Sequence, residues 1–503
     1  MHSPFPALLL ATLAALPGQV RDTDPFPPAT PESQGLASEA LAELVTAVAG
    51  YLEKGELVGA ELLVVKNRRT ILHEVFGWRD RERELAMERH TICNVRSMTK
   101  PLTGAAVQIL VDEGRLGLDD PVAKHLPAFD DEKCRAITLR QLLTHRSGLP
   151  LTVLTESVRQ YDSLQAIAEA AGARGPEFEP DSKFWYSDAG SDVAGAVVEA
   201  VSGQRLDELV HERLLAPLGM SDSFYRTPAD DPRRERIASL YVGSPGSWSR
   251  FWKPDDEPFY PFAWGSQTLY STPRDYARFL AMWMDGGTCG ERRVLSREAL
   301  TRTLTPTSPM STLGSDAPYP TSFRGVRAYY GQMAILWMPH GAAAGAAPVA
   351  APVAPVSIGH SGSDGTYAWA FPAQDLMVLY FTQSRGAASG LRLERVIDRA
   401  LLHPGEELTE EVPDELRPFL GTYLANFGQF QNAEFKVLVQ NGNLAVDVPG
   451  QLVFELKEPD AEGKRYFVLT AEIAVSFDRG EDRVVTGMKL YQAGMTFELP
   501  KKG

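Results

Sequence analysis

The chain has 503 residues, which exceeds one ordinary hydrophobic core and predicts two or three domains. Hydrophobic residues make up 44% of it and charged residues 23%, a balance that excludes wholesale disorder, collagen-like repeats and a small disulfide scaffold. With 50 Lys and Arg against 65 Asp and Glu, the net charge is −15, which disfavours nucleic acid as a partner. The odd number of cysteines cannot pair completely, and no C-x-x-C motif suggests a zinc or redox site: Cys93, Cys134 and Cys289.

The N-terminal segment has the apolar pattern of a secretory signal. Residues 7–16 form an apolar run, followed by Pro17-Gly18 and a Pro-rich stretch, whereas a bilayer-spanning helix needs about 20 residues. The basic start typical of such signals is missing, so a disordered tail is the alternative. We expect residues 1–20 to be a signal peptide and the protein to be periplasmic or secreted. No later apolar segment reaches transmembrane length.

Mixed helical and strand patterns begin at about residue 38. Apolar residues at helical spacing, or runs of β-branched and aromatic residues between turns, predict the following elements. They are a helix over 37–52, a hairpin of strands 59–65 and 70–77, helices over 97–112 and 192–214, a second hairpin of strands 366–371 and 376–382, and a closing helix over 389–402.

The last part of the chain has a different pattern. Residues 341–355 (GAAAGAAPVAAPVAP) are low in complexity and predict a flexible loop, and the Pro- and Glu-rich residues 403–417 predict a linker. Short strands separated by turn residues then predict an antiparallel sheet or small closed barrel. The expected strands are 435–439, 444–448, 453–456, 466–469, 473–477, 484–490 and 495–499.

A serine and a lysine stand three residues apart in Ser97-Met98-Thr99-Lys100. On a helix, positions i and i+3 share a face with Cβ atoms about 5–6 Å apart, so the hydroxyl and the amine can touch. A serine hydroxyl needs a base to become a good nucleophile, and a lysine whose pKa is lowered by burial and the helix dipole can be that base. The motif alone is weak, because a Ser N-cap followed by a surface Lys gives the same pattern.

Tyr186-Ser187-Asp188 is the first candidate companion of this pair. It precedes a long predicted helix, where Tyr186 could serve as a base or proton shuttle and Asp188 could position Lys100 or the substrate. The alternative is structural: Ser187 or Asp188 caps the helix while Tyr186 packs on it.

The second companion is the stretch 359–365 (GHSGSDG), which opens the second hairpin. Its glycines let a ligand approach backbone N–H groups, and a developing oxyanion needs two such donors. His360 could donate a hydrogen bond or carry a positive charge towards an anionic substrate group. The alternative is a flexible turn with a solvated histidine.

With these motifs the chain resembles the serine β-lactamase-related family, which includes class C β-lactamases, D-alanyl-D-alanine carboxypeptidases, D-aminopeptidases and family VIII carboxylesterases. The resemblance spans about residues 38–400 and includes several further signatures in order. These are TICNVRSMTK (91–100), LDDPV (118–122), LLTHRSGL (142–149), PLGM (217–220) and STPRDY (271–276).

The resemblance implies an α+β fold: a β-lactamase/transpeptidase-like antiparallel sheet flanked by helices, with a helical subdomain, over residues 38–402. The linker 403–417 and residues 418–503 follow, and LGTY (420–423) resembles the opening strand of the lipocalin-like β-barrels appended to several members. The stretch 145–149 is expected to be structural. We expect no cofactor and no metal.

Roles follow from the resemblance position by position. Ser97 would be the acylated nucleophile, Lys100 its proton partner and Tyr186 the general base and acid. The backbone N–H groups of Ser97 and Ser363 would form the oxyanion hole. The substrate-binding positions would be Asp188, together with His360, Ser361 and Gly362 on an edge strand.

Two positions depart from the family pattern. Asp188 stands where the second motif usually has Asn, and its charge should raise the pKa of Lys100 and shift the base role to Tyr186. His360 stands where most β-lactamases have Lys, which should weaken binding of a substrate carboxylate. Some carboxypeptidases and peptidases of the family use histidine there.

These features predict a serine hydrolase that cleaves an ester or amide through a Ser97 acyl-enzyme. A carboxylesterase and a D-amino-acid peptidase remain equally open, and an efficient β-lactamase is disfavoured. A catalytically silent binding protein is the alternative from another class. An α/β-hydrolase would need G-x-S-x-G, whose nearest match around Ser363 fails at its first position, and no H-x-x-x-H pair supports a zinc hydrolase. The oligomeric state is not predicted.

Overall fold

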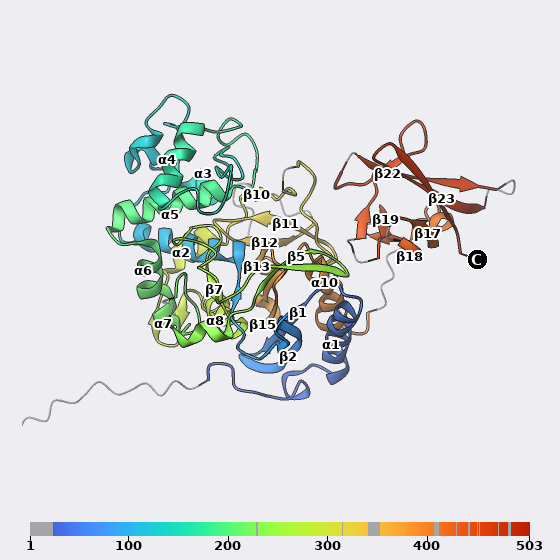
Figure 1. Ribbon diagram of the computed structural model, residues 1–503, viewed down its shortest axis with the longest axis horizontal. Coiled ribbons are helices and arrows are strands. Elements are labelled where there is room, and N and C mark those ends of the chain that lie inside the picture. The colour runs from blue at the N-terminus through green and yellow to red at the C-terminus, as the bar shows by residue number, and fades with distance from the viewer. Residues whose placement is uncertain are drawn as a thin grey trace, which may run out of the picture.

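The computed structural model describes residues 24–502 except 228–229, 314, 341–352, 407–411, 429, 441–442, 450, 452, 471 and 481–483 (Figure 1). The expected signal peptide therefore lies outside the described residues, as do most of the low-complexity loop and part of the linker. Within the described ranges, no helix is both long and apolar enough to cross a bilayer.

A nine-stranded antiparallel sheet forms the centre of the fold, with strand order β10-β11-β12-β13-β14-β15-β1-β2-β3. β1 pairs with β2 on one side and with β15 on the other, so the two predicted hairpins lie next to each other in one sheet. The strands are β1 Gly59–Lys66, β2 Arg69–Asp80, β3 Leu85–Ala86, β10 Ser308–Pro309, β11 Val326–Tyr330, β12 Ile335–Pro339, β13 Ser357–Gly362, β14 Thr366–Phe371 and β15 Leu376–Thr382.

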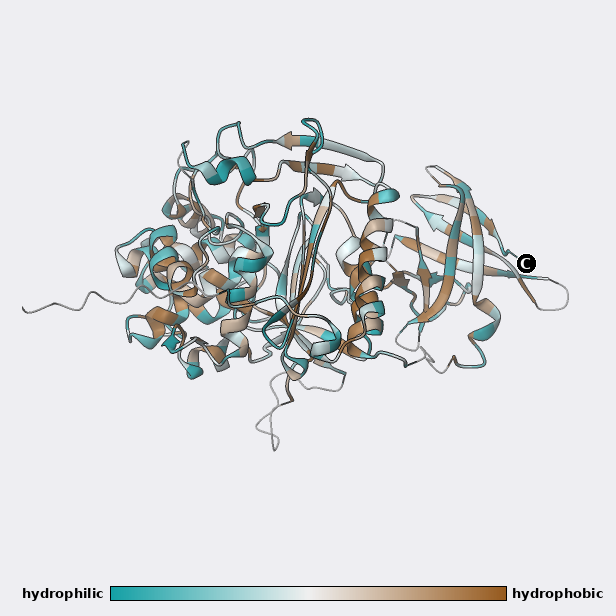
Figure 2. Ribbon diagram, turned by 90° about the horizontal axis from the view of Figure 1, so that it is seen from below, coloured by the Kyte–Doolittle hydropathy of each residue, from teal (hydrophilic) through white to brown (hydrophobic). Residues whose placement is uncertain are grey.

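Helices cover both faces of this sheet, which Figure 2 shows nearly edge-on. Successive side chains of a strand point to opposite faces, so β1 divides its residues between two cores. Leu62 and Val64 pack with α1 (Ser38–Glu53) and α10 (Ser389–Ile397), while Leu63 belongs to the cluster that contains α2 (Lys100–Asp112) and α8 (Pro273–Met284). This explains why residues 62–65 of β1 are all apolar instead of alternating with polar residues.

The helical subdomain corrects one prediction. The single helix expected over 192–214 is wrong: α5 spans Asp188–Ser202, and the chain starts again as α6 at Leu206. α5 begins early because the Ser187 hydroxyl accepts the Gly190 N–H at 2.8 Å, and it ends at Gly203, whose φ of 77° is left-handed. The other helices here are α3 Leu139–Leu143, α4 Leu164–Arg174, α6 Leu206–Val210, α7 Ala216–Leu218 and α9 Arg297–Thr303.

The C-terminal strands form two four-stranded antiparallel sheets around a hydrophobic core of their own. Isolated bridges between Leu456 and Phe467 and between Tyr423 and Lys501 connect the two sheets. The predicted antiparallel strands are thus present, whereas a closed lipocalin-like barrel stays a prediction. The strands are β17 Gly421–Phe427, β18 Phe430–Gln440, β19 Asn443–Asp447, β20 Val453–Glu455, β21 Arg465–Tyr466, β22 Ile473–Arg479, β23 Val485–Gln492 and β24 Met495–Pro500.

Smaller sheets complete the first domain. β5 pairs with both β6 and β16, β4 pairs with β7, and β8 pairs with β9. These strands are β4 Cys93–Asn94, β5 Leu240–Ser244, β6 Ser247–Trp252, β7 Tyr270–Ser271, β8 Thr288–Cys289, β9 Arg292–Arg293 and β16 Ser384–Arg385.

Candidate active site

Ser97 lies at the entrance to the central helix of the subdomain. Residues Arg96–Thr99 form a 3-10 turn and α2 begins at Lys100, so the predicted helix over 97–112 starts as a tighter turn. The Lys100 Nζ donates a hydrogen bond to the Ser97 Oγ at 3.2 Å, and the lysine side chain is completely buried. The contact expected from the three-residue spacing is therefore present.

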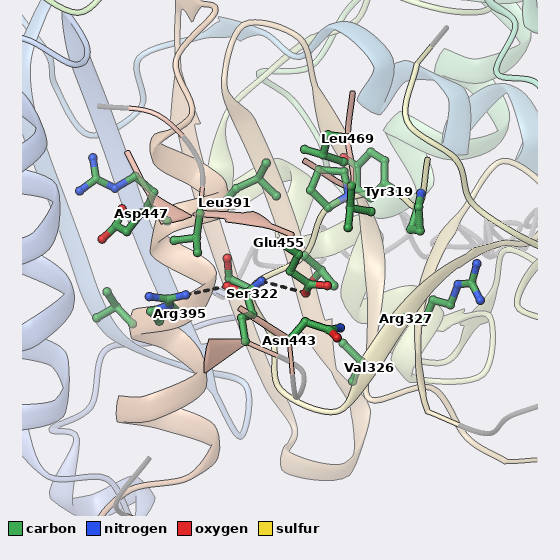
Figure 3. Close-up of a pocket in the computed structure, with 18 of the residues that line it drawn as sticks. Tyr319, Ser322, Val326, Arg327, Leu391, Arg395, Asn443, Asp447, Glu455 and Leu469 are labelled. Atoms are coloured by element: carbon green, nitrogen blue, oxygen red, sulfur yellow. Dashed lines mark hydrogen bonds between the residues drawn. The ribbon is translucent and has the colours of Figure 1, made fainter. Parts of the chain in front are cut away.

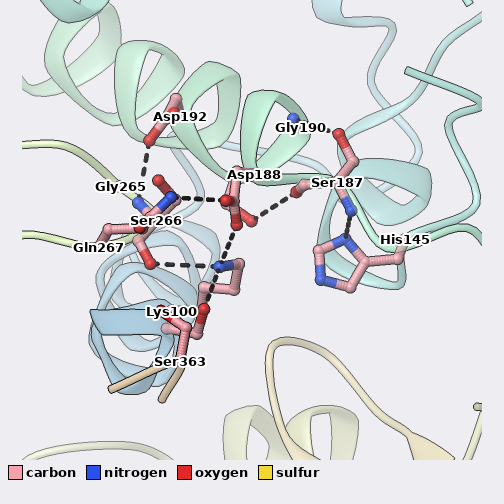
Figure 4. Close-up of polar contacts among 12 residues, drawn as sticks. Lys100, His145, Ser187, Asp188, Gly190, Asp192, Gly265, Ser266, Gln267 and Ser363 are labelled. Atoms are coloured by element: carbon pink, nitrogen blue, oxygen red, sulfur yellow. Dashed lines mark hydrogen bonds and ion pairs between the residues drawn. The ribbon is translucent and has the colours of Figure 1, made fainter. Parts of the chain in front are cut away.

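The N-terminus of α5 brings the second motif to the same point. The Asp188 carboxylate lies 2.6 Å from the Lys100 Nζ (Figure 4). That nitrogen is 4.7 Å from the centroid of the Tyr186 ring. Tyr186 lines the cleft together with Ser97, and Lys100 and Ser97 are close enough to act on the pKa of its phenol. A hydroxyl, an amine, a phenol and a carboxylate from two distant segments thus converge.

The charges of this cluster follow from burial and from Asp188. Burial acts to lower the pKa of Lys100, but the Asp188 carboxylate and Tyr186 together outweigh it and the pKa is raised, so Lys100 is an ammonium at neutral pH. Burial also raises the pKa of Tyr186, against the opposing effect of Lys100. The resting site consequently holds an ammonium and a neutral phenol beside Ser97.

The loop before β7 supports Asp188 and Lys100. Gln267 Nε2 donates to the second Asp188 oxygen at 2.5 Å, and the Ser266 carbonyl accepts from Lys100 Nζ at 3.2 Å. The Ser266 N–H in turn donates to Asp192 at 2.9 Å, and burial raises the pKa of Asp192 to about 8. Sequence analysis missed Gln267 and Asp192. The STPRDY signature places the neighbouring β7, but no spacing indicated these side chains.

Replacing Asp188 with Asn is expected to shift the pH profile of turnover towards lower pH. Without the carboxylate, the Lys100 ammonium is free to stabilise a Tyr186 phenolate, so the pKa of the phenol falls. A base that must be deprotonated then becomes available at lower pH, and the rising limb of kcat/KM should move down by about one pH unit, since one unit corresponds to roughly 1.4 kcal/mol.

The shift is measured by determining kcat/KM from pH 6 to 10 for wild type and for Asp188→Asn in a discontinuous assay. The asparagine side chain retains the size and one acceptor of the native carboxylate, so the geometry around Lys100 is preserved. A uniform loss of activity with an unmoved limb would contradict the electrostatic role and leave Asp188 only a positioning role.

β13 forms the opposite wall of the cleft and corrects a second expectation. It is not an edge strand, because β12 pairs with it on one side and β14 on the other. The β12 pairing ends at Gly359, opposite Ile335, so the three residues that follow pair with β14 alone. A Cβ on Gly362 would lie 2.4 Å from the Val95 carbonyl oxygen, so glycine permits the close approach of β13 to the Ser97 turn.

His360 is buried in this wall and is not a solvated turn residue. Its side chain is 1% exposed, the Ser361 N–H donates to its Nδ1 at 3.0 Å, and its Nε2 lies 3.1 Å from the Tyr330 hydroxyl. Burial, with a smaller effect from Lys100, lowers its pKa to about 3. Of the two roles considered for His360, a positive charge is therefore excluded at neutral pH and hydrogen bonding remains.

His145 packs beneath the site. Its ring centroid is 4.4 Å from that of Tyr186, and its Nδ1 accepts the Ser187 N–H at 3.2 Å. Burial holds the pKa of His145 well below its usual value, so the ring is neutral. These contacts fix the orientation of the second motif and agree with the structural role expected for the 145–149 stretch.

Ser97, Tyr186 and β13 line a cleft of about 330 Å³. Both residues expected to supply the oxyanion hole, Ser97 and Ser363, are among the lining residues, as are His360, Ser361 and Gly362. Most of the remaining wall is apolar, and no Lys or Arg lines it in the described part of the chain. The larger apolar and aromatic lining residues are Met310, Leu313, Tyr319, Ile335, Tyr367 and Leu391.

Two further residues connect the walls of the cleft. The Tyr319 hydroxyl lies 3.0 Å from the Ser361 Oγ, and Arg385 donates from Nη2 to the Ser363 Oγ at 3.2 Å. Sequence analysis identified neither, because Tyr319 lies in a loop without a motif and Arg385 lies on the short strand β16, which no pattern marks. Nowhere in the described ranges do three or more His, Cys, Asp or Glu side chains gather as metal ligands.

Comparison with known proteins identifies the family. The Beta-lactamase family model matches residues 44–402. The chain belongs to the beta-lactamase family. This family consists mainly of serine hydrolases, and its fold is the α+β arrangement with a large antiparallel sheet described above.

One sequence relative and two solved structures illustrate how similar the chain is to known proteins. Protein flp of Staphylococcus aureus is 29% identical over 214 residues, which is 42% of this chain and 43% of flp, so the chain aligns with less than half of that relative. An octameric penicillin-binding protein homologue from Pyrococcus abyssi has a TM-score of 0.60 at 20% identity, covering 92% of this chain and all of that one. A family VIII carboxylesterase has a TM-score of 0.56 at 21% identity, covering 73% and 99%.

Proposed function

We propose that this beta-lactamase-family protein is a carboxylesterase that hydrolyses short acyl esters through a Ser97 acyl-enzyme. The observation that carries the proposal is the cleft itself: Ser97 opens onto an apolar pocket with no cationic side chain among its described lining residues, and His360 within it is neutral. A neutral ester can enter such a pocket without leaving a charge unpaired, whereas a substrate carboxylate would be desolvated there without a partner. The likeness to a family VIII carboxylesterase agrees with this preference.

In the proposed reaction Tyr186 first loses its proton to solvent, and the Lys100 ammonium stabilises the resulting phenolate. The Ser97 Oγ then attacks the ester carbonyl, and its proton passes to this phenolate. The backbone N–H groups of Ser97 and Ser363 donate to the oxyanion. Collapse of the tetrahedral intermediate breaks the C–O bond, and Tyr186 returns the proton to the leaving alkoxide. Water, deprotonated by the same base, then releases the acid from Ser97. Asp188 keeps Lys100 charged throughout.

A D-amino-acid peptidase is the second candidate, and Arg385 is the observation in its favour. Its guanidinium reaches the Ser363 hydroxyl at the mouth of the cleft and is 40% exposed. It could receive a substrate carboxylate, although its Nε already lies 3.4 Å from the Asp364 carboxylate. Because Arg385 already pairs with Asp364, it is less available to a substrate carboxylate. The peptidase is therefore the second candidate function, after the carboxylesterase.

The same proposal assigns residues 38–402 to the hydrolase domain, 403–417 to a linker and 418–503 to a β-rich domain. It makes residues 1–20 the signal peptide of an exported protein. Mass spectrometry of the protein recovered from the periplasm or medium of an expressing cell would reveal cleavage near residue 20.

A substrate panel tests the proposal. We expect p-nitrophenyl acetate and butyrate to be hydrolysed at least about 100-fold faster than nitrocefin or D-alanine p-nitroanilide, because leaving a buried charge unpaired costs several kcal/mol. A fluorophosphonate should label Ser97, located by peptide mass spectrometry. Rapid nitrocefin hydrolysis would show that the cleft accepts a substrate carboxylate although His360 is neutral, and would contradict the preference for neutral esters. Folded protein that takes no label would support a catalytically silent binder.

If Arg385 serves a peptidase, Arg385→Ala should lower turnover of D-alanine p-nitroanilide derivatives that carry a free carboxylate and leave p-nitrophenyl acetate hydrolysis unchanged. If the protein is a carboxylesterase, Arg385→Ala should not lower turnover of the carboxylate-bearing anilides more than that of p-nitrophenyl acetate.

A further inference from the structure

A second cavity lies between the hydrolase domain and the C-terminal strands. Its volume is about 440 Å³, larger than the cleft at Ser97 and within the range of small-molecule sites. The hydrolase domain contributes α10, the loop 318–322, the start of β11, Tyr51 of α1 and His340 to its walls. The C-terminal domain contributes the strands β18 to β20 and residues 468–469 (Figure 3). Neither domain forms this cavity alone.

About half of the residues that line the cavity are apolar. Val326 and Leu391 from the hydrolase domain and Val453 and Leu469 from the C-terminal domain are among them. An apolar body would bury surface against both domains at once, which favours a ligand with a hydrocarbon portion.

Among the described residues, the charged ones that line the cavity are three arginines and the carboxylates Asp447 and Glu455. The arginines differ in how they are paired. Arg392 is held by both oxygens of Glu56 at 2.8 Å, and Arg395 donates to Gln440 at 2.8 Å. Arg327, on β11 at the other end of the cavity, is exposed and has no ion pair or hydrogen bond to any described residue. The cavity thus offers one guanidinium whose donors are available to an anion, and guanidinium groups bind carboxylates through paired hydrogen bonds.

The loop 318–322 separates this cavity from the cleft at Ser97. Tyr319 and Leu391 line both, and the Tyr319 hydroxyl lies 3.0 Å from the Ser361 Oγ on β13. The loop is also tied to α10, because the Ser322 N–H and the Thr321 hydroxyl both donate to the buried Glu394 carboxylate, at 2.7 and 2.9 Å. A ligand that contacts the loop therefore contacts the wall of the cleft.

We propose that the interdomain cavity binds a small amphipathic carboxylate, with its hydrocarbon portion against the apolar lining residues and its carboxylate on Arg327, and that binding is coupled to the cleft through Tyr319. The binding step stands on the cavity alone. The coupling step rests on the proposed esterase function. The C-terminal domain then has a role as one half of a ligand site.

Binding is tested with octanoate on the full chain by isothermal titration calorimetry, with octanamide as the uncharged control. We expect one octanoate per chain, Arg327→Gln to weaken binding roughly tenfold through loss of a charge-assisted hydrogen bond, and Val453→Trp, which fills the cavity, to abolish binding. Arg297→Gln, an exposed arginine on α9 outside the cavity, is the matched control and should bind as wild type. Octanoate that binds Arg327→Gln and Val453→Trp as tightly as wild type, or does not bind wild type, overturns the proposal.

Coupling is tested with p-nitrophenyl butyrate. Saturating octanoate should change KM by roughly fivefold or more, the lower end of typical allosteric coupling, and the change should disappear in Val453→Trp and in Tyr319→Phe, while Tyr319→Phe still binds octanoate. A change that persists in Val453→Trp would locate octanoate in the cleft and overturn the coupling, as would bound octanoate that leaves KM unchanged. Absence of esterase activity in wild type would refute the proposed function and leave the calorimetric result standing.

Discussion

Replacing Ser97 with Ala is expected to lower kcat on p-nitrophenyl butyrate by roughly 10⁴- to 10⁶-fold, the range typical of removing a catalytic nucleophile. In the proposed reaction the hydroxyl forms the covalent bond to the acyl group, and the nearby Lys100 amine cannot replace it because Asp188 holds it as an ammonium. Tyr186→Phe should cost less, roughly 10²- to 10⁴-fold, because it removes proton transfer and leaves the nucleophile in place. Steady-state kinetics with an active-site titrant measures both effects.

Ser363→Ala is the matched control for Ser97→Ala. The proposed contribution of Ser363 is its backbone N–H, which alanine retains, so this variant should keep most of its activity. Its hydroxyl contacts only Arg385 among the described residues. If Ser363→Ala abolished turnover while Ser97→Ala did not, Ser363 would be the nucleophile and the assignment of the site would be wrong.

The parts of the fold that sequence analysis predicts are those that short-range patterns determine. Both hairpins are confirmed because their apolar strands are bounded by turns, and the Ser97–Lys100 contact is confirmed because helical spacing alone brings the side chains together. The helix break at Gly203 was missed because the apolar periodicity continues across it. There the left-handed glycine overrides the pattern.

The parts that could not be predicted depend on distant packing. Gln267 and Asp192 reach the site only when the loop before β7 lies against α5, and Tyr319 reaches Ser361 across a loop without a motif. The charge of His360 follows from its burial against Tyr330, which a sequence pattern does not show. The interdomain cavity requires the relative placement of two domains, so it was beyond prediction as well.

The second large effect is expected at a buried ion pair behind the site. Arg96 immediately precedes Ser97 and has a left-handed φ of 49°, and its Nε lies 2.6 Å from an Asp364 oxygen. Both side chains are 0% exposed. Burial acts to lower the pKa of Arg96, but Asp364, with Tyr260 and Tyr270, outweighs it and raises the pKa, so the guanidinium stays charged. Asp364 follows Ser363, so this pair joins the two segments proposed to form the oxyanion hole.

Asp364→Ala is expected to reduce the free energy of unfolding by about 3–5 kcal/mol, because it leaves the Arg96 charge buried without its partner. Urea denaturation followed by tryptophan fluorescence measures the loss. The matched control is Glu43→Gln, which breaks the exposed pair with Arg399 and should change stability by less than about 1 kcal/mol.

A double variant separates the stabilising and positioning roles of this pair. Replacing both charges, in Arg96→Met with Asp364→Leu, removes the unpaired charge and should recover most of the stability lost in Asp364→Ala, since apolar replacements of buried pairs are often neutral or better. Its kcat should nevertheless stay low, because the ion pair no longer fixes the Ser97 turn against Ser363. Recovery of both stability and kcat would show that the ion pair does not position the oxyanion hole. A loss of less than about 1 kcal/mol in Asp364→Ala would show that water reaches Arg96 and that the pair is not buried in solution.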